Sequence, residues 1–366
     1  MLRTIRDITH SILGRGEASI TVPSFDGALK PNQALEGAEI LFECAAPEDL
    51  ATDGKDVFLA DGLKLTRIER GKAVPVREFD KPITALACLP GGALAVALNG
   101  REVHVYATPG AAEPEMSFAG ADMRSVNALS PDGEGGLIAT DGSADCDTDD
   151  WAWDLMKRGS SGRALRLDRK TGDVSLMARG LQYAFGAVAT ENGHAIVSES
   201  WRHRLMAVAP DGATRIALAH LPVYPSRMSP GAGGGWWMTA FTARTQLVEF
   251  VLREKTYRKR MLAEVAPEYW IVPRLSSGHS FKEPMQGAHL KTMGVVKPWA
   301  PPRSYGLVVR LDENVQPVFS LHSRVDGTNH GVVAAVECNG ALYMIAKGPR
   351  RVLRLPVEGL AEEFMV

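Results

Sequence analysis

Four polar residues stand at the start of short apolar segments, and their side chains could carry out chemistry. Glu48 offers a carboxylate, Asn127 an amide, Arg227 a guanidinium and His330 an imidazole. A neutral imidazole can act as a general base near pH 7, so His330 is a candidate catalytic base. The alternative is a structural histidine bonded to the backbone of a neighbouring segment. Which chemistry is available depends on the elements that carry these four residues.

A repeated pattern of strands carries them. Each copy reads as an apolar strand, a glycine-containing turn, a second apolar strand, a polar break and a third strand. The turns are Asp53-Gly54, Gly91-Gly92, Asp132-Gly133, Asn192-Gly193, Gly233-Gly234 and Asn339-Gly340. Asn-Gly or Asp-Gly between two apolar runs is a strong hairpin signal. Six copies of roughly 40 residues predict an all-β chain folded as a six-bladed β-propeller.

The ends of the chain fit the same interpretation. Residues 38–44 (AEILFEC) are predicted to complete the last blade and close the ring, because an unclosed propeller leaves sheet edges exposed. Residues 38–366 then form one propeller domain, preceded by an N-terminal helix and arm over 1–37. The helix, within residues 1–14, is too short and too polar for a membrane span. It packs on the body or makes a weak membrane-surface contact.

Two copies are interrupted by long insertions, at residues 144–162 and 242–304. Long excursions inside a compact fold are usually lids or binding loops. We therefore expect both insertions to lie over one mouth of the central tunnel, with Trp153 and Trp270 against a bound small molecule. The alternative is that these rings only hold the insertions to the body.

The composition excludes some classes of protein. The chain has 366 residues, a formal net charge of -2 and no basic cluster with interleaved aromatic residues, which argues against a nucleic-acid partner. Its four cysteines have no metal-binding spacing and read as reduced thiols, which favours a cytoplasmic protein. The oligomeric state is left open.

Several segments, in their order and spacing, resemble a known group of propellers. They are LIATDGS at 137–143, GRALRLDRKTG at 162–172, SESWRHRL at 198–205, PVYPSRM at 222–228 and GALYMIAKG at 340–348. The chain resembles the strictosidine-synthase-like group of the calcium-dependent phosphotriesterase superfamily, which also holds the SMP-30/gluconolactonase and paraoxonase families. This resemblance implies a six-bladed propeller that binds a small-molecule substrate where its innermost strands begin.

The resemblance also implies a metal site made of oxygen donors that suit Ca²⁺. Glu48 and Asn127 match two of the donors, whereas Phe185 and Arg227 stand where relatives supply the others. A divalent cation is therefore a candidate cofactor with an incomplete set of ligands. Alternatively, Arg227 replaces the cation, since a guanidinium is always charged and offers five donors. It would pair with Glu48, Asn127 would donate its amide to the same carboxylate, and Phe185 would fill the vacated space.

The resemblance favours a hydrolase of a small cyclic or ester-like, lactone-type metabolite. Glu48 and His330 are then the candidate catalytic residues, and the candidate substrate-binding residues are Arg227, Asn127, Phe185, Trp153 and Trp270. A lyase or synthase that forms or breaks a C–C or C–N bond is an alternative. For that reaction the resemblance aligns Val333 with a catalytic glutamate, with Glu337 nearby in sequence. A non-catalytic ligand-binding propeller is the third hypothesis.

Overall fold

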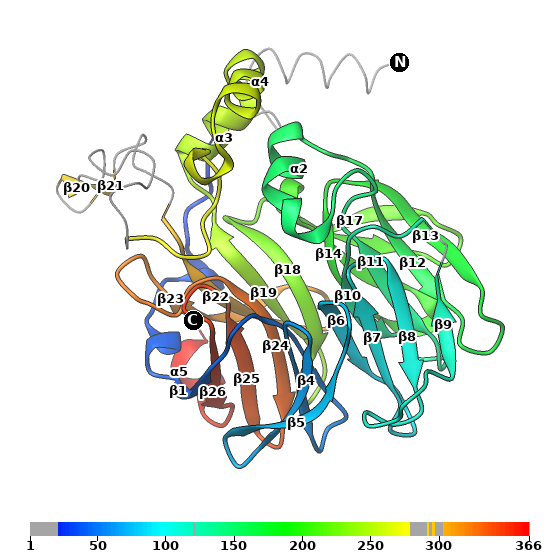
Figure 1. The fold of residues 1–366 in the computed structure, drawn as a ribbon. Helices are drawn as coiled ribbons and strands as arrows, with labels where there is room; N and C mark the ends of the chain where they lie inside the picture. Colours follow the sequence, from blue (N-terminus) through cyan, green and yellow to red (C-terminus); the bar gives the residue numbers. More distant parts are fainter. Residues whose placement is uncertain (1–20, 120–121, 279–290, 293–294, 297–302, 366) are drawn as a thin grey trace.

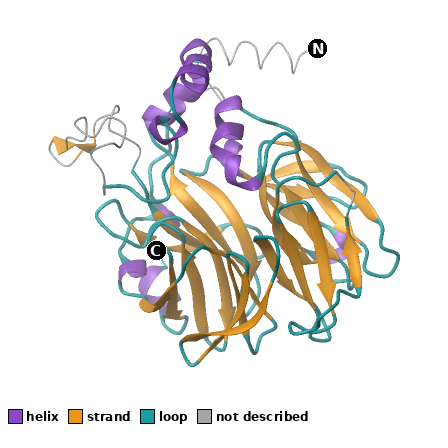
Figure 2. Cartoon of the chain, viewed as in Figure 1, coloured by secondary structure: helices purple, strands orange, loops and turns teal. Residues whose placement is uncertain are grey.

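The computed structural model describes residues 21–119, 122–278, 291–292, 295–296 and 303–365. It contains six four-stranded antiparallel sheets, which confirms the predicted six-bladed propeller (Figure 1). Helices are few, and Figure 2 shows most of them gathered at one end of the strands. The predicted N-terminal helix lies outside the described residues.

The first three blades follow one another along the chain, each with its innermost strand first. Blade 1 comprises β2 (Pro47–Thr52), β3 (Val57–Asp61), β4 (Lys64–Glu69) and β5 (Lys72–Glu78). Blade 2 comprises β6 (Ile83–Cys88), β7 (Leu94–Leu98), β8 (Glu102–Tyr106) and β9 (Met116–Phe118). Blade 3 comprises β10 (Val126–Pro131), β11 (Leu137–Asp141), β12 (Gly162–Leu167) and β13 (Val174–Leu181).

The other three blades complete the ring. Blade 4 comprises β14 (Ala184–Ala189), β15 (Ala195–Glu199), β16 (Arg204–Val208) and β17 (Thr214–Leu218). Blade 5 comprises β18 (Val223–Pro230), β19 (Trp236–Ala243), β22 (Gly306–Leu311) and β23 (Pro317–Ser323). Blade 6 comprises β24 (Val332–Cys338), β25 (Ala341–Ala346), β26 (Arg351–Pro356) and β1 (Glu39–Glu43).

The ring is closed by a strand from the beginning of the chain. Strand β1 pairs antiparallel with β26, with Glu39 opposite Arg354 and Glu43 opposite Arg351. Closure by residues 38–44 is thereby confirmed. It covers the edge of β26, which would otherwise present unpaired backbone groups.

Local sequence explains why the strands turn where they do. Between β24 and β25 the two turn residues Asn339 and Gly340 have φ values of 50° and 71°. Positive φ at both positions is the two-residue hairpin geometry that Asn-Gly favours. The inner strands of a blade face a neighbouring blade on each side, so their side chains are buried, as in the second strand β7, where all five residues are buried.

The remaining elements are short. The helices are α2 (Trp151–Lys157), α3 (Gln246–Arg253), α4 (Lys255–Glu264) and α5 (Leu360–Phe364). The 3₁₀ turns are η2 (Gly27–Leu29), η3 (Ala34–Glu36), η4 (Thr148–Asp150), η5 (Glu191–Gly193), η6 (Ser200–Arg202) and η7 (Pro267–Tyr269). Strands β20 (Lys291–Thr292) and β21 (Val295–Val296) form a two-stranded sheet. Among the described residues, no helix has the length and apolar character needed to cross a membrane.

Both insertions leave the propeller at the same end. The first follows β11, whose last residue Asp141 lies opposite Val126 at the start of the innermost strand β10. The second follows β19, whose last residue Ala243 lies opposite Val223 at the start of β18. We call this end, where the innermost strands begin, the mouth. The described parts of both insertions therefore start from one mouth, as predicted, and their action as a lid over a bound ligand stays a prediction.

The two insertions also share a hydrophobic core. Met156 of α2 packs in one cluster with Val248 of α3, Met261 of α4 and Trp270. We refer to α2, α3, α4 and residues 265–272 as the canopy. Figure 1 shows these helices standing beyond the ends of the strands.

Candidate functional site

Arg227 reaches the axis of the propeller from an irregular part of β18. The pairing of β18 with β19 shifts register twice, between Tyr224 and Pro225 and between Pro225 and Met228. A bulge of this kind re-aims a side chain away from the regular alternation. Gly186 of β14 makes room for it, because a Cβ there would lie 2.6 Å from the Ser226 carbonyl oxygen.

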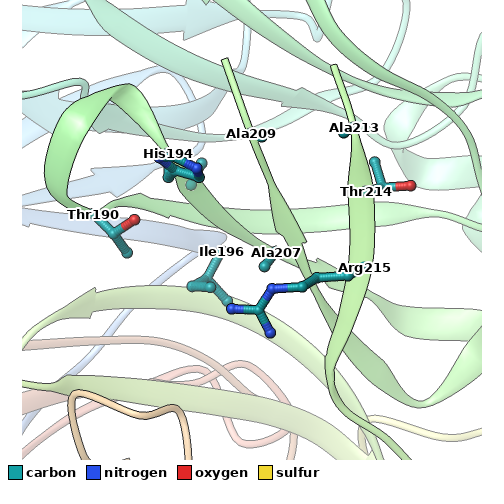
Figure 3. A pocket seen from close by; sticks show the side chains of 9 residues that line it. Thr190, His194, Ile196, Ala207, Ala209, Ala213, Thr214 and Arg215 are labelled. Atoms are coloured by element: carbon teal, nitrogen blue, oxygen red, sulfur yellow. The ribbon is translucent and has the colours of Figure 1, made fainter. Parts of the chain in front are cut away.

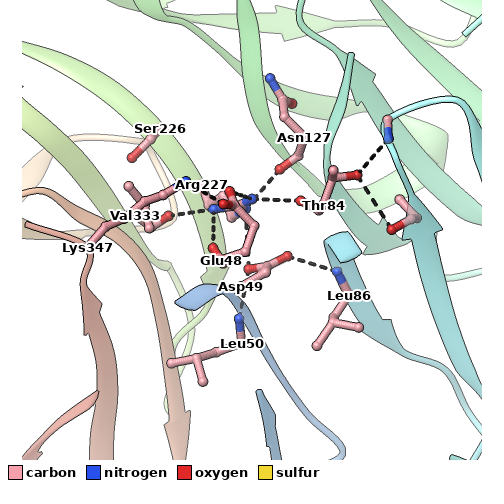
Figure 4. A network of polar contacts seen from close by, with 12 residues as sticks. Glu48, Asp49, Leu50, Thr84, Leu86, Asn127, Ser226, Arg227, Val333 and Lys347 are labelled. Carbon is pink, nitrogen blue, oxygen red and sulfur yellow. Dashed lines mark hydrogen bonds and ion pairs between the residues drawn. The ribbon is translucent and has the colours of Figure 1, made fainter. Parts of the chain in front are cut away.

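The guanidinium of Arg227 forms hydrogen bonds to four other blades, and Figure 4 shows it at the centre of this network. Nε donates to the Asn127 carbonyl at 2.9 Å, and Nη2 donates to the Thr84 carbonyl at 2.9 Å. Nη1 donates to the Glu48 carbonyl at 2.8 Å and to the Val333 carbonyl at 3.3 Å. The fifth hydrogen bond joins Nη2 to the Glu48 carboxylate at 3.2 Å. All five donors of the guanidinium are therefore used by the protein.

The fourth blade meets the same group through an aromatic ring. The guanidinium carbon of Arg227 lies 5.2 Å from the centroid of the Phe185 ring, within cation–π distance. The side chain is 5% exposed. One buried cation on blade 5 thus contacts each of the other five blades, and the predicted Arg227–Glu48 pair is present.

Asn127 contributes to this centre through its backbone, which corrects our expectation for its side chain. The side-chain amide donates to the Ala184 carbonyl at 2.9 Å, and its oxygen accepts from Thr140 at 2.8 Å. It therefore does not donate to Glu48. Both polar atoms of this fully buried side chain are used, the amide nitrogen to tie blade 3 to blade 4 and the oxygen within blade 3.

The arrangement does not fit a Ca²⁺ site built on Glu48 and Asn127. A fixed guanidinium points at the oxygens that a metal would need, and its charge would repel a second cation. The Asn127 oxygen accepts a hydrogen bond from Thr140, and Phe185 offers no donor atom. Among the described residues, no three His, Cys, Asp or Glu side chains are grouped to hold a metal ion.

Lys347 is a functional candidate that the sequence reasoning missed. It follows β25, and its ammonium forms an ion pair with Oε2 of Glu48, whose other oxygen faces Arg227. The side chain of Lys347 is 31% exposed and that of Glu48 is 16% exposed. Second strands run antiparallel to the innermost ones, so their last residues also reach the mouth, and this signal could have located Lys347.

The two cations determine the charge of Glu48. Burial has the largest single effect on the pKa of Glu48 and raises it. The positive charges of Lys347 and Arg227, of which Lys347 has the larger effect, together lower the pKa by more. The pKa of Glu48 consequently lies below its ordinary value. The carboxylate is ionised at neutral pH and retains contact with solvent.

Asp49, the next residue, faces away from the mouth and is 3% exposed. Burial raises its pKa to about 6, against the opposing effects of Arg227 and the amides of Leu86 and Leu50. Those amides donate to its two oxygens, each at 2.9 Å. Asp49 therefore links blade 1 to blade 2. Its Oδ1 also lies 3.3 Å from Nε of Arg227.

His330 is held in place by hydrogen bonds to the protein, one of them to a backbone carbonyl, which agrees with the alternative of a structural histidine. It is 4% exposed, and its Nδ1 lies 2.6 Å from the Ser304 hydroxyl. Its Nε2 lies 2.7 Å from the backbone carbonyl of Arg324, which can only accept, so the ring donates there. Both ring nitrogens bond to residues flanking blade 5, and this geometry does not present His330 as a base to a substrate.

Val333 and Glu337 do not supply the carboxylate that a synthase of the strictosidine type would use. Val333 is an apolar side chain that is 3% exposed. Glu337 lies near the far end of β24 from the mouth, where it accepts from the Trp237 indole at 2.7 Å and the Ala232 amide at 3.0 Å. Its carboxylate is thus held at the other end of the tunnel.

The aromatic residues predicted to contact substrate have separate positions. Trp270 is 5% exposed within the canopy core, and its indole donates to the Val265 carbonyl at 2.8 Å. This placement favours the alternative that its ring holds the insertion in place. Trp153 is partly buried against the same core with Lys157 at 4.4 Å over its ring, and its contact with substrate stays a prediction.

A different set of rings lies between the canopy and the axis. Trp151 lies edge-on to Phe241 with ring centroids 5.6 Å apart, and Phe241 lies 6.2 Å from Phe185. Trp151, Phe185 and Leu275 are partly buried and pack on the cluster that contains Val333. The mouth therefore combines an ionised Glu48–Lys347 pair with an aromatic wall, to which the first insertion contributes Trp151 and beside which the second insertion places Leu275.

A largely buried carboxylate helps to fix each insertion to the propeller. Asp154 of α2 accepts from the Ser143 hydroxyl and the Trp201 indole, each at 2.7 Å. These two hydrogen bonds connect α2 to blades 3 and 4. Such contacts hold the canopy in place above the mouth.

Glu249 of α3 connects the second insertion to blades 4 and 5 in the same way. It lies 3.3 Å from His203 Nε2, 3.1 Å from Arg244 Nε and 3.3 Å from the Tyr224 hydroxyl. Burial opposes its ionisation, but His203 and Arg244 together lower the pKa of Glu249 to about 2. The second insertion is thus anchored by a buried ionic group.

A cavity of about 350 Å³ on blade 4 lies apart from these groups (Figure 3). Its lining comes from β15, β16, β17 and the adjoining turns, and small alanine side chains make up much of it. It contains none of the predicted site residues.

The fold and the axial site together define a six-bladed propeller with a guanidinium at its centre. No family model matches the chain. The chain is similar in sequence to the adipocyte plasma membrane-associated protein of Mus musculus, with 26% identity over 306 residues that cover 71% of this chain and 72% of the relative.

Two solved structures are similar in fold. A gluconolactonase from Xanthomonas campestris has a TM-score of 0.55 and 14% identity, covering 87% of this chain and 88% of its own. A luciferin-regenerating enzyme has a TM-score of 0.53 and 12% identity, covering 89% of this chain and 95% of its own. At these identities the likeness establishes the fold.

Proposed function

We propose that the protein hydrolyses a small ester or lactone at the mouth, with Glu48 as the general base and Lys347 as the group that stabilises the oxyanion. The observation that carries this proposal is the position of the Glu48 carboxylate. It stands at the tunnel mouth between two cations, ionised and 16% exposed to solvent. An ionised carboxylate in reach of water is what general-base catalysis requires.

The chemistry follows from the two side chains. Glu48 takes a proton from a water molecule as the water oxygen bonds to the substrate carbonyl carbon. The ammonium of Lys347 donates a hydrogen bond to the carbonyl oxygen as it becomes negative. The C–O bond of the ester then breaks, and the proton held by Glu48 passes to the leaving alkoxide. A lactone would give a hydroxy acid by this route.

The site restricts the kind of substrate. A carboxylate with a lowered pKa is a weak base, so the carbonyl must be reactive, as in a lactone or an activated ester. The partly buried rings of Trp151 and Phe185 offer an apolar surface for the substrate body. The name gluconolactonase, carried by a structural neighbour, agrees with a lactone substrate.

Arg227 acts in this proposal as a positioning residue. All of its N–H donors bond to the protein. Arg227 therefore orients Glu48 and favours its ionised form without contacting the substrate. In this role it replaces the metal that the resemblance implies.

A non-catalytic ligand-binding propeller is the second candidate. It is favoured by the saturation of Arg227, because the guanidinium at the axis has no hydrogen left for an oxyanion. The mouth would then bind a small molecule through Lys347 and the aromatic wall without converting it. A cytoplasmic location stays a prediction, and the mouse relative is named for association with the plasma membrane.

The test is a screen of aliphatic lactones and aryl esters in excess chelator, with purified wild-type protein and the Glu48→Gln variant. We expect chelator-resistant hydrolysis that falls about 100-fold or more in the variant, the usual contribution of a general base. Glu43→Gln, a change at an exposed carboxylate (75% exposed), is the matched control. If no member of the panel is hydrolysed but some bind, the non-catalytic function replaces the proposal.

A further inference from the structure

Exposed apolar side chains are concentrated on the canopy. Of the nine large hydrophobic residues that are exposed among the described residues, four lie within residues 250–269. They are Phe250, Tyr257, Val265 and Tyr269, with exposures of 47%, 51%, 38% and 40%. Scattered single residues of this kind need no explanation, but a cluster on one projecting element indicates an interaction surface.

The same surface is basic. Helix α4 contains Lys255, Arg258, Lys259 and Arg260 but only one acidic residue, Glu264, in a chain whose formal net charge is -2. Arg258 is turned inward and donates to the Leu252 carbonyl at 2.6 Å. Lys255, Lys259 and Arg260 are exposed. With the flanking Arg253, Glu254 and Glu268 included, residues 250–269 hold five basic and three acidic side chains, which leaves a local excess of positive charge at the tip of the canopy.

The aromatic and basic groups share one hollow. A cavity of about 450 Å³ is lined by Thr256, Tyr257, Arg260, Met261, Glu264, Val265, Tyr269 and Ile271. Two tyrosines and an arginine therefore border apolar side chains in the same depression. Tyrosine at the boundary between apolar and polar groups, next to lysine and arginine, is typical of protein surfaces that contact lipid headgroups.

We propose that this surface, made of Phe250, Tyr257, Val265, Tyr269 and the exposed basic residues of α4, docks on an anionic phospholipid bilayer. Charge complementarity selects the partner: the local positive charge matches a negative headgroup layer. Helix α4 is polar over most of its surface, so the contact is peripheral and insertion is not expected.

A nucleic acid is the other partner that basic and aromatic groups could bind. The bilayer is favoured because Phe250 and Val265 need an apolar environment rather than a stacking base. In addition, the canopy helices project beyond the propeller (Figure 1), which suits a flat partner. Docking in this way would turn the mouth toward the lipid, but the proposal does not depend on hydrolysis there.

The test is co-sedimentation of the full chain with vesicles of phosphatidylcholine alone or mixed with phosphatidylserine. We expect binding only to the anionic vesicles, weakening as salt is raised because exposed charges are screened. The variant Lys255→Glu/Lys259→Glu/Arg260→Glu should lose about tenfold or more in affinity. Lys255→Glu/Lys259→Glu keeps the Arg260–Glu264 ion pair of 3.0 Å and should show an intermediate loss.

A matched control has the same change of charge at the other end of the propeller. Lys72, Lys170 and Arg215 are exposed and lie at the ends of strands away from the mouth, so Lys72→Glu/Lys170→Glu/Arg215→Glu should bind as the wild type does. The proposal is overturned if the wild type stays in the supernatant with anionic vesicles at low salt, or if both triple variants lose binding equally. Displacement from vesicles by a short single-stranded oligonucleotide at equal phosphate would assign the surface to nucleic acid instead.

Discussion

Arg227 contacts Glu48 twice, with Nη1 on its backbone carbonyl at 2.8 Å and Nη2 on its carboxylate at 3.2 Å. The two residues are 179 positions apart in the sequence and belong to blades 5 and 1. The positive charge at the centre of the tunnel is thus a covalent part of the chain. This arrangement makes the axial charge independent of metal supply.

Removing the guanidinium should destabilise the whole ring. Arg227→Met would leave the buried carboxylate of Asp49 without its cation and Glu48 with Lys347 as its remaining ion-pair partner. Breaking a buried ion pair in this way typically costs about 3–5 kcal/mol. We expect a loss of that size in the free energy of unfolding, measured with urea.

The control for that variant is Arg324→Met, which removes an exposed guanidinium (45% exposed) paired with Asp326 at 3.1 Å. It should cost less than about 1 kcal/mol. A loss below 1 kcal/mol for Arg227→Met, or its full recovery on adding Ca²⁺, would contradict the structural role of Arg227.

Gly186 should tolerate no side chain. Its φ is 153°, and a Cβ would lie 2.7 Å from the Arg227 Cα as well as 2.6 Å from the Ser226 oxygen. Gly186→Ala therefore has to push β18 away from β14 and displace Arg227. The control Gly233→Ala also has positive φ, 75°, but has nothing within 4 Å. We expect the Gly186 variant to lose clearly more stability than the control in thermal unfolding; equal losses would contradict the close-packing argument.

Glu249 should hold the canopy in place down to low pH. Its pKa in the folded protein is about 2, below the value of about 4.3 for an unfolded chain. The stabilisation is therefore present above that unfolded pKa and is lost as the pH falls toward 2. Pepsin should leave residues 245–270 intact at pH 4 in the wild type and cut them there in Glu249→Gln, whereas Glu254→Gln, at an exposed position, should resist. Equal cleavage of both variants would disprove the anchor.

The pH dependence of hydrolysis should report the charges around Glu48. Because the pKa of Glu48 is lowered, the base stays deprotonated to lower pH than an ordinary glutamate, and the acid limb of kcat/KM should lie below the pH at which an ordinary glutamate titrates. Lys347→Met removes the strongest of the charges that lower this pKa, so the acid limb should move to higher pH. An acid limb near pH 6.5 in the wild type would instead indicate a histidine as the base.

The fold was predictable from the sequence because each blade repeats the same local signals. Hairpin turns such as Asn339-Gly340 set strand length and register without help from distant residues. The Arg227–Glu48 pair was predictable too, since the repeat pattern places both residues near the starts of innermost strands and a buried carboxylate needs a cation.

The positions of other side chains depend on local irregularities that periodicity does not reveal. A register shift between Val126 and Ala128 in β10 accompanies an Asn127 side chain that faces blade 4 and not the axis. Lys347 follows the end of the second strand β25, whereas the sequence prediction considered only the first residues of innermost strands. The positions of His330 and Trp270 depend on contacts with loops and the canopy, which no local pattern encodes.

The guanidinium of Arg227, and not a metal ion, is expected to hold the axial position. The most direct test is calorimetric titration of Ca²⁺ into chelator-treated wild-type protein, with Glu48→Gln beside it. We predict no saturable binding at the axis and the same heats for both proteins. Binding of one Ca²⁺ per chain that is abolished by Glu48→Gln would contradict the claim.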